Sequence, residues 1–173
     1  EEEGYERIRE EVNFTSRPPI AIQLTLKRQV LFAPEQIGSG RTVSARELSI
    51  PRGAREAMER GLNLMNQKSD YRGSVAQFQR AVREYPQYYE AYMQMGVAYR
   101  RLGDAAKSEQ NLRTSIDLSQ RKYPDALFRL ASVYSMQKRF ADAEPLAREA
   151  LKLSPDSPEV HQELALALYG LDQ

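Results

Sequence analysis

A self-similarity at intervals of 34 to 35 residues constrains this chain more than any other feature of its sequence. Small residues recur at Gly61, Gly96, Ala131 and Ala165, and an apolar residue follows each of them three positions later. A repeat of this length is typical of helix pairs that stack side by side, because one pair cannot bury its apolar face alone. The sequence therefore predicts a mainly α fold, a solenoid of helix pairs over residues 51–173.

Turn signals divide the chain at the same intervals. Ser69-Asp70, Gly103-Asp104 and Lys138-Arg139 predict the turn inside each helix pair, and Pro86 and Pro155 separate successive pairs. The result is three helix pairs plus one extra helix. The predicted repeats are 54–88, 89–123 and 124–157, followed by a partial repeat at 158–173.

These positions resemble the tetratricopeptide repeat, in which a small residue of the first helix lets the second helix cross closely. The second helix of that repeat carries an apolar residue followed by a small one, as Phe78 and Ala81 do here. The pattern departs mildly at Lys68, where the first repeat has an extra residue, and at Ser115 and Gln120, where Ala and Pro are usual. The resemblance implies a non-catalytic scaffold for protein–protein interaction.

Residues 1–28 have a different texture. Residues 20–27 alternate apolar and polar side chains, which predicts a half-buried strand, and the break at Thr15–Pro19 favours a short β-hairpin before a linker at 29–50. Gly4-Tyr5-Glu6-Arg7 followed by this strand resembles the end of β-sandwich modules similar to the regulatory domain of carboxypeptidases. That resemblance implies an exported bacterial protein, periplasmic or extracellular.

Charge and composition bear on the partners. The chain has 25 basic and 24 acidic residues, interleaved, so it builds no long-range positive field and nucleic acid binding is not expected. Cysteine is absent, which excludes disulfides, thiol catalysis and thiolate metal sites. No run of 18 apolar residues occurs, so direct membrane insertion is not expected either.

No arrangement of residues predicts catalysis, a cofactor or a metal. His161 is the single histidine, and only Glu159 and Glu163 share its helix at a suitable spacing, which favours a packing role. The segment 37–42 lacks the glycine spacing of a phosphate-binding loop, and Asn13-Phe14-Thr15 matches a glycosylation pattern that is common by chance. We therefore expect no enzymatic activity.

Two further groups admit a binding role. The basic pairs are Lys27-Arg28, Arg100-Arg101 and Arg121-Lys122. Their acidic neighbours favour solvated surface. The clustered tyrosines are Tyr85, Tyr88, Tyr89, Tyr92 and Tyr99. They could form a binding platform, but two of them fall on expected packing positions, which favours the core between repeats.

The first helices of successive tetratricopeptide repeats line a concave surface, so corresponding positions predict a groove. The predicted groove residues are Met58, Leu62, Met65, Met93, Val97, Arg101, Phe128, Ser132, Met136, Gln162 and Leu166. This set is apolar and rich in methionine, which suits an amphipathic helix or an extended apolar segment of another protein. The alternative occupant is the chain's own Val30-Leu31-Phe32 or Thr42–Ile50.

The groove lacks the residues with which some family members grip a C-terminal carboxylate. Those members use Lys, Asn and Arg on this face. The corresponding positions here are Met58, Leu62, Val97, Phe128 and Ser132. A carboxylate clamp is therefore not expected.

The last helix suggests a second function. It begins at a capping Ser157 with Pro158 in its first turn, and it is apolar over more of its circumference than an end helix should be. Together with an uncompleted strand pair at the other end, this face could join copies head to tail. The alternative to a binding module is thus a self-assembling subunit, and either would belong to a larger assembly.

Overall fold

The computed structural model describes residues 45–172. The predicted β-hairpin at 1–28, with its β-sandwich resemblance, lies outside these residues. Within 45–172 the regular elements are all helices, and no strand occurs. The helices are α3 (Ala45–Ser49), α4 (Arg52–Lys68), α5 (Tyr71–Glu84), α6 (Tyr89–Arg101), α7 (Ala105–Leu118), α8 (Pro124–Met136), α9 (Phe140–Leu153) and α10 (Pro158–Leu171). The prediction of a mainly α chain of repeated helices is confirmed.

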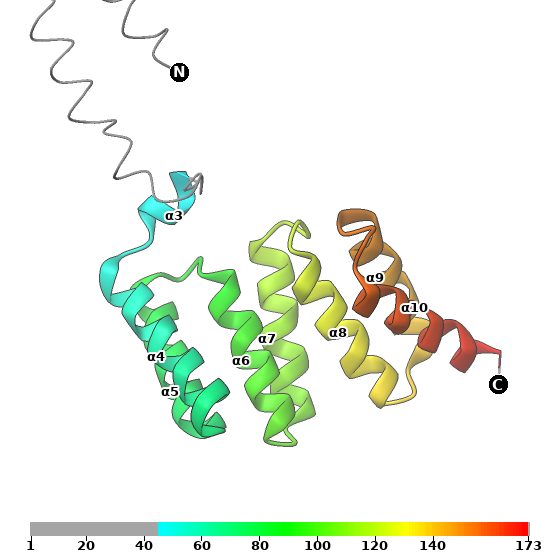
Figure 1. The fold of residues 1–173 in the computed structure, drawn as a ribbon, viewed down its shortest axis with the longest axis horizontal. Helices are drawn as coiled ribbons and strands as arrows, with labels where there is room; N and C mark the ends of the chain where they lie inside the picture. The colour runs from blue at the N-terminus through cyan, green and yellow to red at the C-terminus, as the bar shows by residue number, and fades with distance from the viewer. Residues whose placement is uncertain (1–44, 173) are drawn as a thin grey trace, which may run out of the picture. The chain divides into compact units, whose positions relative to one another are not determined.

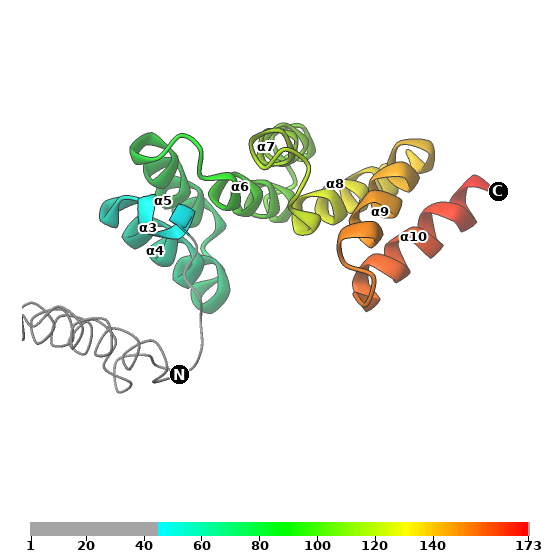
Figure 2. The same ribbon diagram turned by 90° about the horizontal axis from the view of Figure 1, so that it is seen from above.

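The helices from Arg46 onward form one compact unit. Its helix pairs are α4/α5, α6/α7 and α8/α9, and α10 packs on α9 and α8. Seen from above, α4, α6, α8 and α10 follow the hollow side of an arc, and α5, α7 and α9 follow its outer side (Figure 2). We call these two sets the inner layer and the outer layer.

The turn within each pair places a residue in the left-handed region of backbone conformation. Ser69 has a φ of 53°, Gly103 of 79° and Lys138 of 60°, at the three predicted turns. The second helix then begins on a side-chain cap in two of the pairs. The carboxylate of Asp70 accepts a hydrogen bond from the backbone N–H of Gly73 at 2.8 Å, and that of Asp104 accepts one from Lys107 at 3.0 Å.

The period of small residues has a direct packing cause. A Cβ added at Gly61 would overlap the ring of Phe78, and one added at Gly96 would lie 2.6 Å from Leu112 Cγ. In the third pair Ala131 and Ala147 are both fully buried at the corresponding positions. The first helix therefore has a glycine where the second helix has a large side chain, Phe78 or Leu112. It has an alanine where the second helix has the smaller Ala147.

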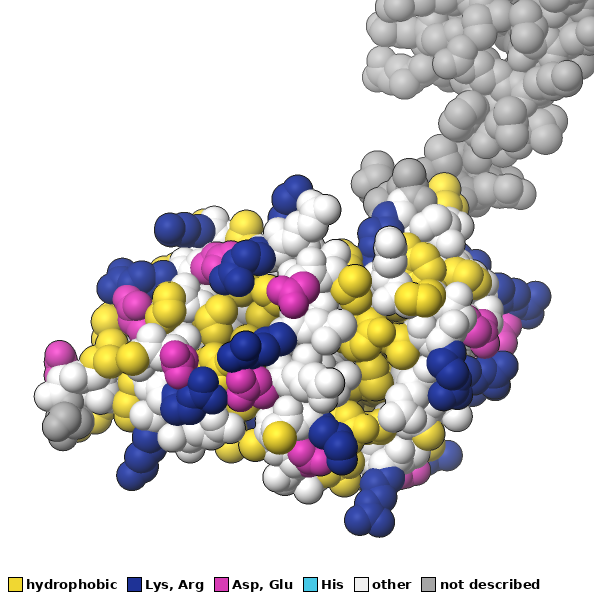
Figure 3. Space-filling view, turned by 180° about the vertical axis from the view of Figure 1, so that it is seen from behind, with side chains coloured by type: hydrophobic (Ala, Val, Ile, Leu, Met, Phe, Trp, Pro, Cys, Tyr) yellow, Lys and Arg dark blue, Asp and Glu magenta, His cyan; other side chains and the backbone are white. Residues whose placement is uncertain are grey.

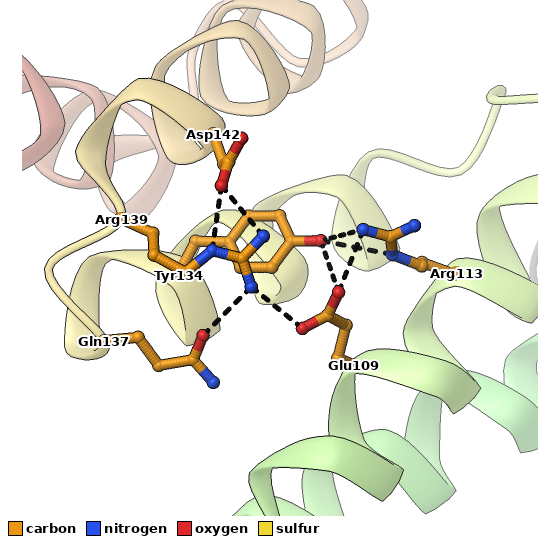
Figure 4. A network of polar contacts seen from close by, with 6 residues as sticks. All are labelled: Glu109, Arg113, Tyr134, Gln137, Arg139 and Asp142. Carbon is orange, nitrogen blue, oxygen red and sulfur yellow. Dashed lines mark hydrogen bonds and ion pairs between the residues drawn. The ribbon is translucent and has the colours of Figure 1, made fainter.

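A polar network joins α7 to α8 and to the start of α9 (Figure 4). The hydroxyl of Tyr134 in α8 lies 2.9 Å from Glu109 Oε1 and 2.7 Å from Arg113 Nη2, both in α7. Arg139 places its guanidinium 4.0 Å from the centroid of the Tyr134 ring and pairs with Glu109 and Asp142. This network joins the second helix pair to the third.

The tyrosine cluster is divided between core and half-buried positions. Tyr88 is 8% exposed and meets Tyr85 edge to face, with ring centroids 5.8 Å apart. Tyr89 packs on Tyr123 at 5.0 Å, and its backbone carbonyl accepts a 2.8 Å hydrogen bond from Ser115 Oγ. The departure from alanine at Ser115 thus links α7 to the start of α6.

Candidate protein-binding groove on the inner layer

All eleven predicted groove residues lie on α4, α6, α8 and α10, the helices of the inner layer (Figure 2). They occupy corresponding places on these helices because the repeats are 34 to 35 residues long. The structure therefore brings together, along one layer, residues that are more than a hundred positions apart in the chain.

The eleven residues differ in how far a ligand could reach them. Met93 is only 5% exposed and belongs to the core cluster, against which Val97 and Phe128 also pack. Met136 is 67% exposed and Leu166 is 48% exposed. The half-buried positions are Met58, Leu62, Met65, Val97, Phe128 and Ser132, and the remaining exposed ones are Arg101 and Gln162. The exposed and half-buried side chains are the ones available to a partner.

A group of three arginines accompanies this apolar surface: Arg100 and Arg101 at the end of α6, and Arg129 in α8. Eight other arginines of the described residues form ion pairs with carboxylates. Arg100, Arg101 and Arg129 form none within 45–172. Burial, together with the positive charges of Arg101 and Arg129, lowers the pKa of Arg100.

A cavity of about 240 Å³ opens beside Arg100, between the end of α6 and the end of α8. Arg100 Nη1 lies 3.7 Å from the sulfur of Met136, and Val133 and Gln137 of the same segment also line the cavity. The cavity thus has a cation at its edge and apolar side chains around it.

Two buried polar atoms near the arginines lack hydrogen-bond partners within 45–172. They are Arg129 Nε and Glu163 Oε1, and Glu163 is 7% exposed. The guanidinium of Arg129 lies 5.1 Å from the centroid of the Phe128 ring. The carboxylate of Glu163 is the one negative charge that raises the pKa of Arg100. The three arginines and Glu163 carry a combined formal charge of +2, from three positive and one negative side chain.

The outer layer contains a larger hollow of about 350 Å³, also lined by arginines. There, however, Arg113 pairs with Glu109 and Arg121 pairs with Glu149, so both cations are already neutralised. Figure 3 shows the same balance across the outer face, where basic and acidic side chains alternate. Arg100, Arg101 and Arg129 differ from these two arginines because they form no ion pair within 45–172.

Residues 46–50, at the end of the predicted linker, lie against α4 and α6. Ile50 is 6% exposed in a cluster that includes Ala54 and Ala91, with Met58 packed against it. Arg46 forms two 2.6 Å contacts with the carboxylate of Glu90, which raise the pKa of Arg46. Ile50 thus contacts one predicted groove residue, Met58. The other parts of the predicted own-chain occupant, Val30–Phe32 and 42–44, lie outside the described residues.

The remaining candidates from the sequence have ordinary surroundings or fall outside 45–172. His161 is exposed, so the packing role predicted for it is wrong, and its Nδ1 lies 2.9 Å from the backbone carbonyl of Ser157. No group of three or more His, Asp or Glu side chains in the described residues could hold a metal ion. No helix in this part of the chain is long and apolar enough to span a membrane. The segments 13–15 and 37–42 are not among the described residues.

Comparison with protein families places residues 87–156 in a tetratricopeptide repeat model. This match covers the second and third helix pairs, α6/α7 and α8/α9. A comparison with curated protein sequences gave no significant match. The second and third helix pairs therefore match the tetratricopeptide repeat.

Several solved structures are similar to this chain in fold. The first such domain of Spaghetti (RPAP3), bound to the HSP90 peptide SRMEEVD, superposes with a TM-score of 0.66 at 20% identity, over 78% of this chain and 100% of that one. The TPR2B domain of yeast Sti1, in complex with pHsp70, gives 0.64 at 19% identity, over 69% and 98%. The structure of MamA gives 0.64 at 20% identity, over 70% of each chain. At these identities the likeness establishes the fold.

Sequence reasoning missed Arg129 and assigned Arg100 to solvated surface. Arg129 directly follows the predicted groove residue Phe128, and Arg100 directly precedes Arg101. The repeat register could have placed all three arginines on the inner layer. The lack of carboxylate partners could be learned only from the structure.

Proposed function

We propose that the inner layer of this solenoid binds a segment of another protein, as a non-catalytic scaffold. The observation that carries the proposal is the row of accessible apolar residues along successive inner helices, from Met58 and Leu62 in α4 to Leu166 in α10. Contiguous exposed apolar surface on a folded unit is typical of an interaction site.

The similar structures support this function. The Spaghetti domain is bound to an HSP90 peptide, and the yeast Sti1 domain is in complex with pHsp70. Both share the helical fold of this chain. An extended or helical segment laid along the arc would contact several repeats at once.

The test is a selection of peptides by the full chain. A phage-displayed library of random 12-residue peptides is panned against the purified protein, and the enriched peptides are compared with those selected by Leu62→Glu and Leu166→Glu. These substitutions place a charge among the accessible groove residues. We expect the two variants to lose the enriched peptides, because apolar side chains bind poorly beside an unpaired carboxylate.

The matched control is Ala106→Glu, which adds the same charge at an exposed position of α7 in the outer layer. It should select the same peptides as the unmodified chain. Enriched peptides that bind the Leu62 and Leu166 variants as well as the unmodified chain would place the binding site elsewhere and reject the groove.

A second candidate function rests on α10. Ala165 occupies the place of Gly61 and Gly96, which pack against the helix that follows them, yet it is exposed. Leu168 is 38% exposed, and Tyr169 is 65% exposed. This uncovered face suits self-association, which sedimentation over a hundredfold concentration range would reveal as a rising mass. A constant monomer mass would reject self-association.

A further inference from the structure

Charge distinguishes between the possible occupants of the groove. Arg100 and Arg129 are partly buried, and no carboxylate of the described residues lies within ion-pair distance of them. Bringing like charges together while removing water from them is unfavourable. The arrangement is therefore stabilised when an anion from outside joins the cluster.

The surroundings say what kind of anion fits. Met136 and Val133 line the cavity beside Arg100, and Phe128 lies under the guanidinium of Arg129. A small inorganic anion would leave the exposed side chain of Met136 and the half-buried ring of Phe128 uncovered. A carboxylate carried on a chain with apolar neighbours would meet both the charge and the apolar wall.

The position of the arginine cluster distinguishes a side-chain carboxylate from the carboxylate at a chain end. The three arginines lie on α6 and α8, the two middle helices of the inner layer, with Arg100 and Arg101 at the end of α6. Accessible apolar residues continue on one side in α4, at Met58 and Leu62, and on the other in α10, at Leu166. A bound chain can therefore run past the arginines in both directions, which favours a side-chain carboxylate over a chain end.

We propose that the groove selects an internal acidic segment of a partner protein, in which Asp or Glu side chains contact Arg100, Arg101 and Arg129 and flanking apolar side chains contact α4 and α10. This inference rests on the proposed binding function and specifies its ligand. The arginine cluster supplies the charge selectivity, and the apolar residues supply the contact area.

The experiment uses the same library of random 12-residue peptides, displayed so that their C-termini are joined to the coat protein. The full chain is panned in parallel with the double variant Arg100→Gln/Arg129→Gln. The control is Arg72→Gln/Arg83→Gln, which removes two exposed arginines of α5 in the outer layer that form no ion pair in the described residues. Both double variants change the net charge equally.

We expect peptides selected by the unmodified chain and by the control to be rich in Asp or Glu flanked by apolar residues. The Arg100/Arg129 variant should keep the apolar preference and lose the acidic one. The tightest peptide, resynthesised with Gln for Glu, should bind the unmodified chain about tenfold more weakly, and salt should weaken the acidic form more than the Gln form. This peptide comparison stands even if the double variant folds poorly.

Several results would overturn the inference. Selected peptides without acidic enrichment would do so, as would acidic enrichment that survives in the Arg100/Arg129 variant. A resynthesised peptide that loses its affinity when its C-terminus is amidated would show that a chain end is read instead. In these cases the groove proposal still stands. Failure of any peptide to be enriched would reject the proposed function and this inference together.

Discussion

Tyr134 of α8 and Glu109 of α7 are joined by a hydrogen bond of 2.9 Å between the phenolic oxygen and Oε1. Arg113 donates to the same phenolic oxygen from Nη2 at 2.7 Å, and burial is the main cause of the raised pKa of Tyr134. In a repeat array each repeat contacts only its neighbours. The stability of the whole array therefore depends on contacts between repeats, such as the one between α7 and α8.

Tyr134→Phe should lower the free energy of unfolding by about 1 kcal/mol, because it removes the acceptor and donor that Arg113 and Glu109 use. Urea denaturation followed by circular dichroism measures the change. Tyr99→Phe is the matched control, since Tyr99 holds the corresponding place in α6 and its hydroxyl forms no hydrogen bond with the described residues. Equal effects of the two substitutions would contradict the role of the network.

Gly96→Ala should destabilise the fold by about 1 to 3 kcal/mol, because the added Cβ would lie 2.6 Å from Leu112 Cγ and 3.2 Å from the backbone oxygen of Ser108. Leu112→Ala should also destabilise it, by leaving a cavity. The double variant reproduces the Ala131 and Ala147 pair of the third repeat. We expect it to lose less stability than the sum of the two, by about 1 kcal/mol in a double-mutant cycle. Strict additivity would show that these positions do not pack against each other.

Met93→Ala should cost about 2 to 4 kcal/mol, because Met93 is 5% exposed and lies in the core with Leu127 and Leu130. Leu166→Ala, at a position 48% exposed, should cost much less. Thermal unfolding of both variants checks this. Reduced ligand affinity in Met93→Ala would then report lost stability, which is why the binding tests use Leu62 and Leu166. A small effect of Met93→Ala would place its side chain in the groove after all.

Glu149 gives the array a pH-dependent contact. The hydrogen bond from Arg121 Nε, 2.7 Å long, lowers the pKa of Glu149 below its ordinary value of 4.5. A lowered folded-state pKa contributes stability that is present above pH 4.5 and is lost as the pH falls through the folded-state value. Glu149→Gln should therefore be less stable than the unmodified chain at pH 7, by at most about 1 kcal/mol, with the difference shrinking in acid.

Urea denaturation at pH 7 and about pH 3 measures this convergence. Arg121→Gln provides the reciprocal control, because once the arginine is removed, Glu149→Gln should have no further effect at either pH. A constant difference between the two pH values would show that Glu149 acts through packing and not through its charge.

The helical array could be predicted because its cause is local and repeated. Gly61 and Gly96 are small where a second helix crosses, and Asp70 and Asp104 cap the helices that follow the turns. The same positions recur at 34 to 35 residues, so one pattern is stated several times. The prediction at 1–28 had no such repetition, and it remains a prediction.

The groove shows where the sequence was insufficient. Corresponding positions placed Met93 and Leu166 on the same layer, but a register says nothing of depth, and Met93 is buried whereas Leu166 is half exposed. The burial of a residue depends on the size of neighbours from other helices. The same holds for charge, because Arg100 and Arg113 look alike in the sequence and only the latter meets a carboxylate.

The sequence alone thus determined the helix pairs, their turns and the layer on which each residue lies, because these depend on backbone preference and on a period within one repeat. The tertiary structure decided which apolar residues remain accessible and which arginines lack a partner. Both properties arise where different repeats meet, between side chains distant in the chain, and the proposed selection of an acidic segment depends on them.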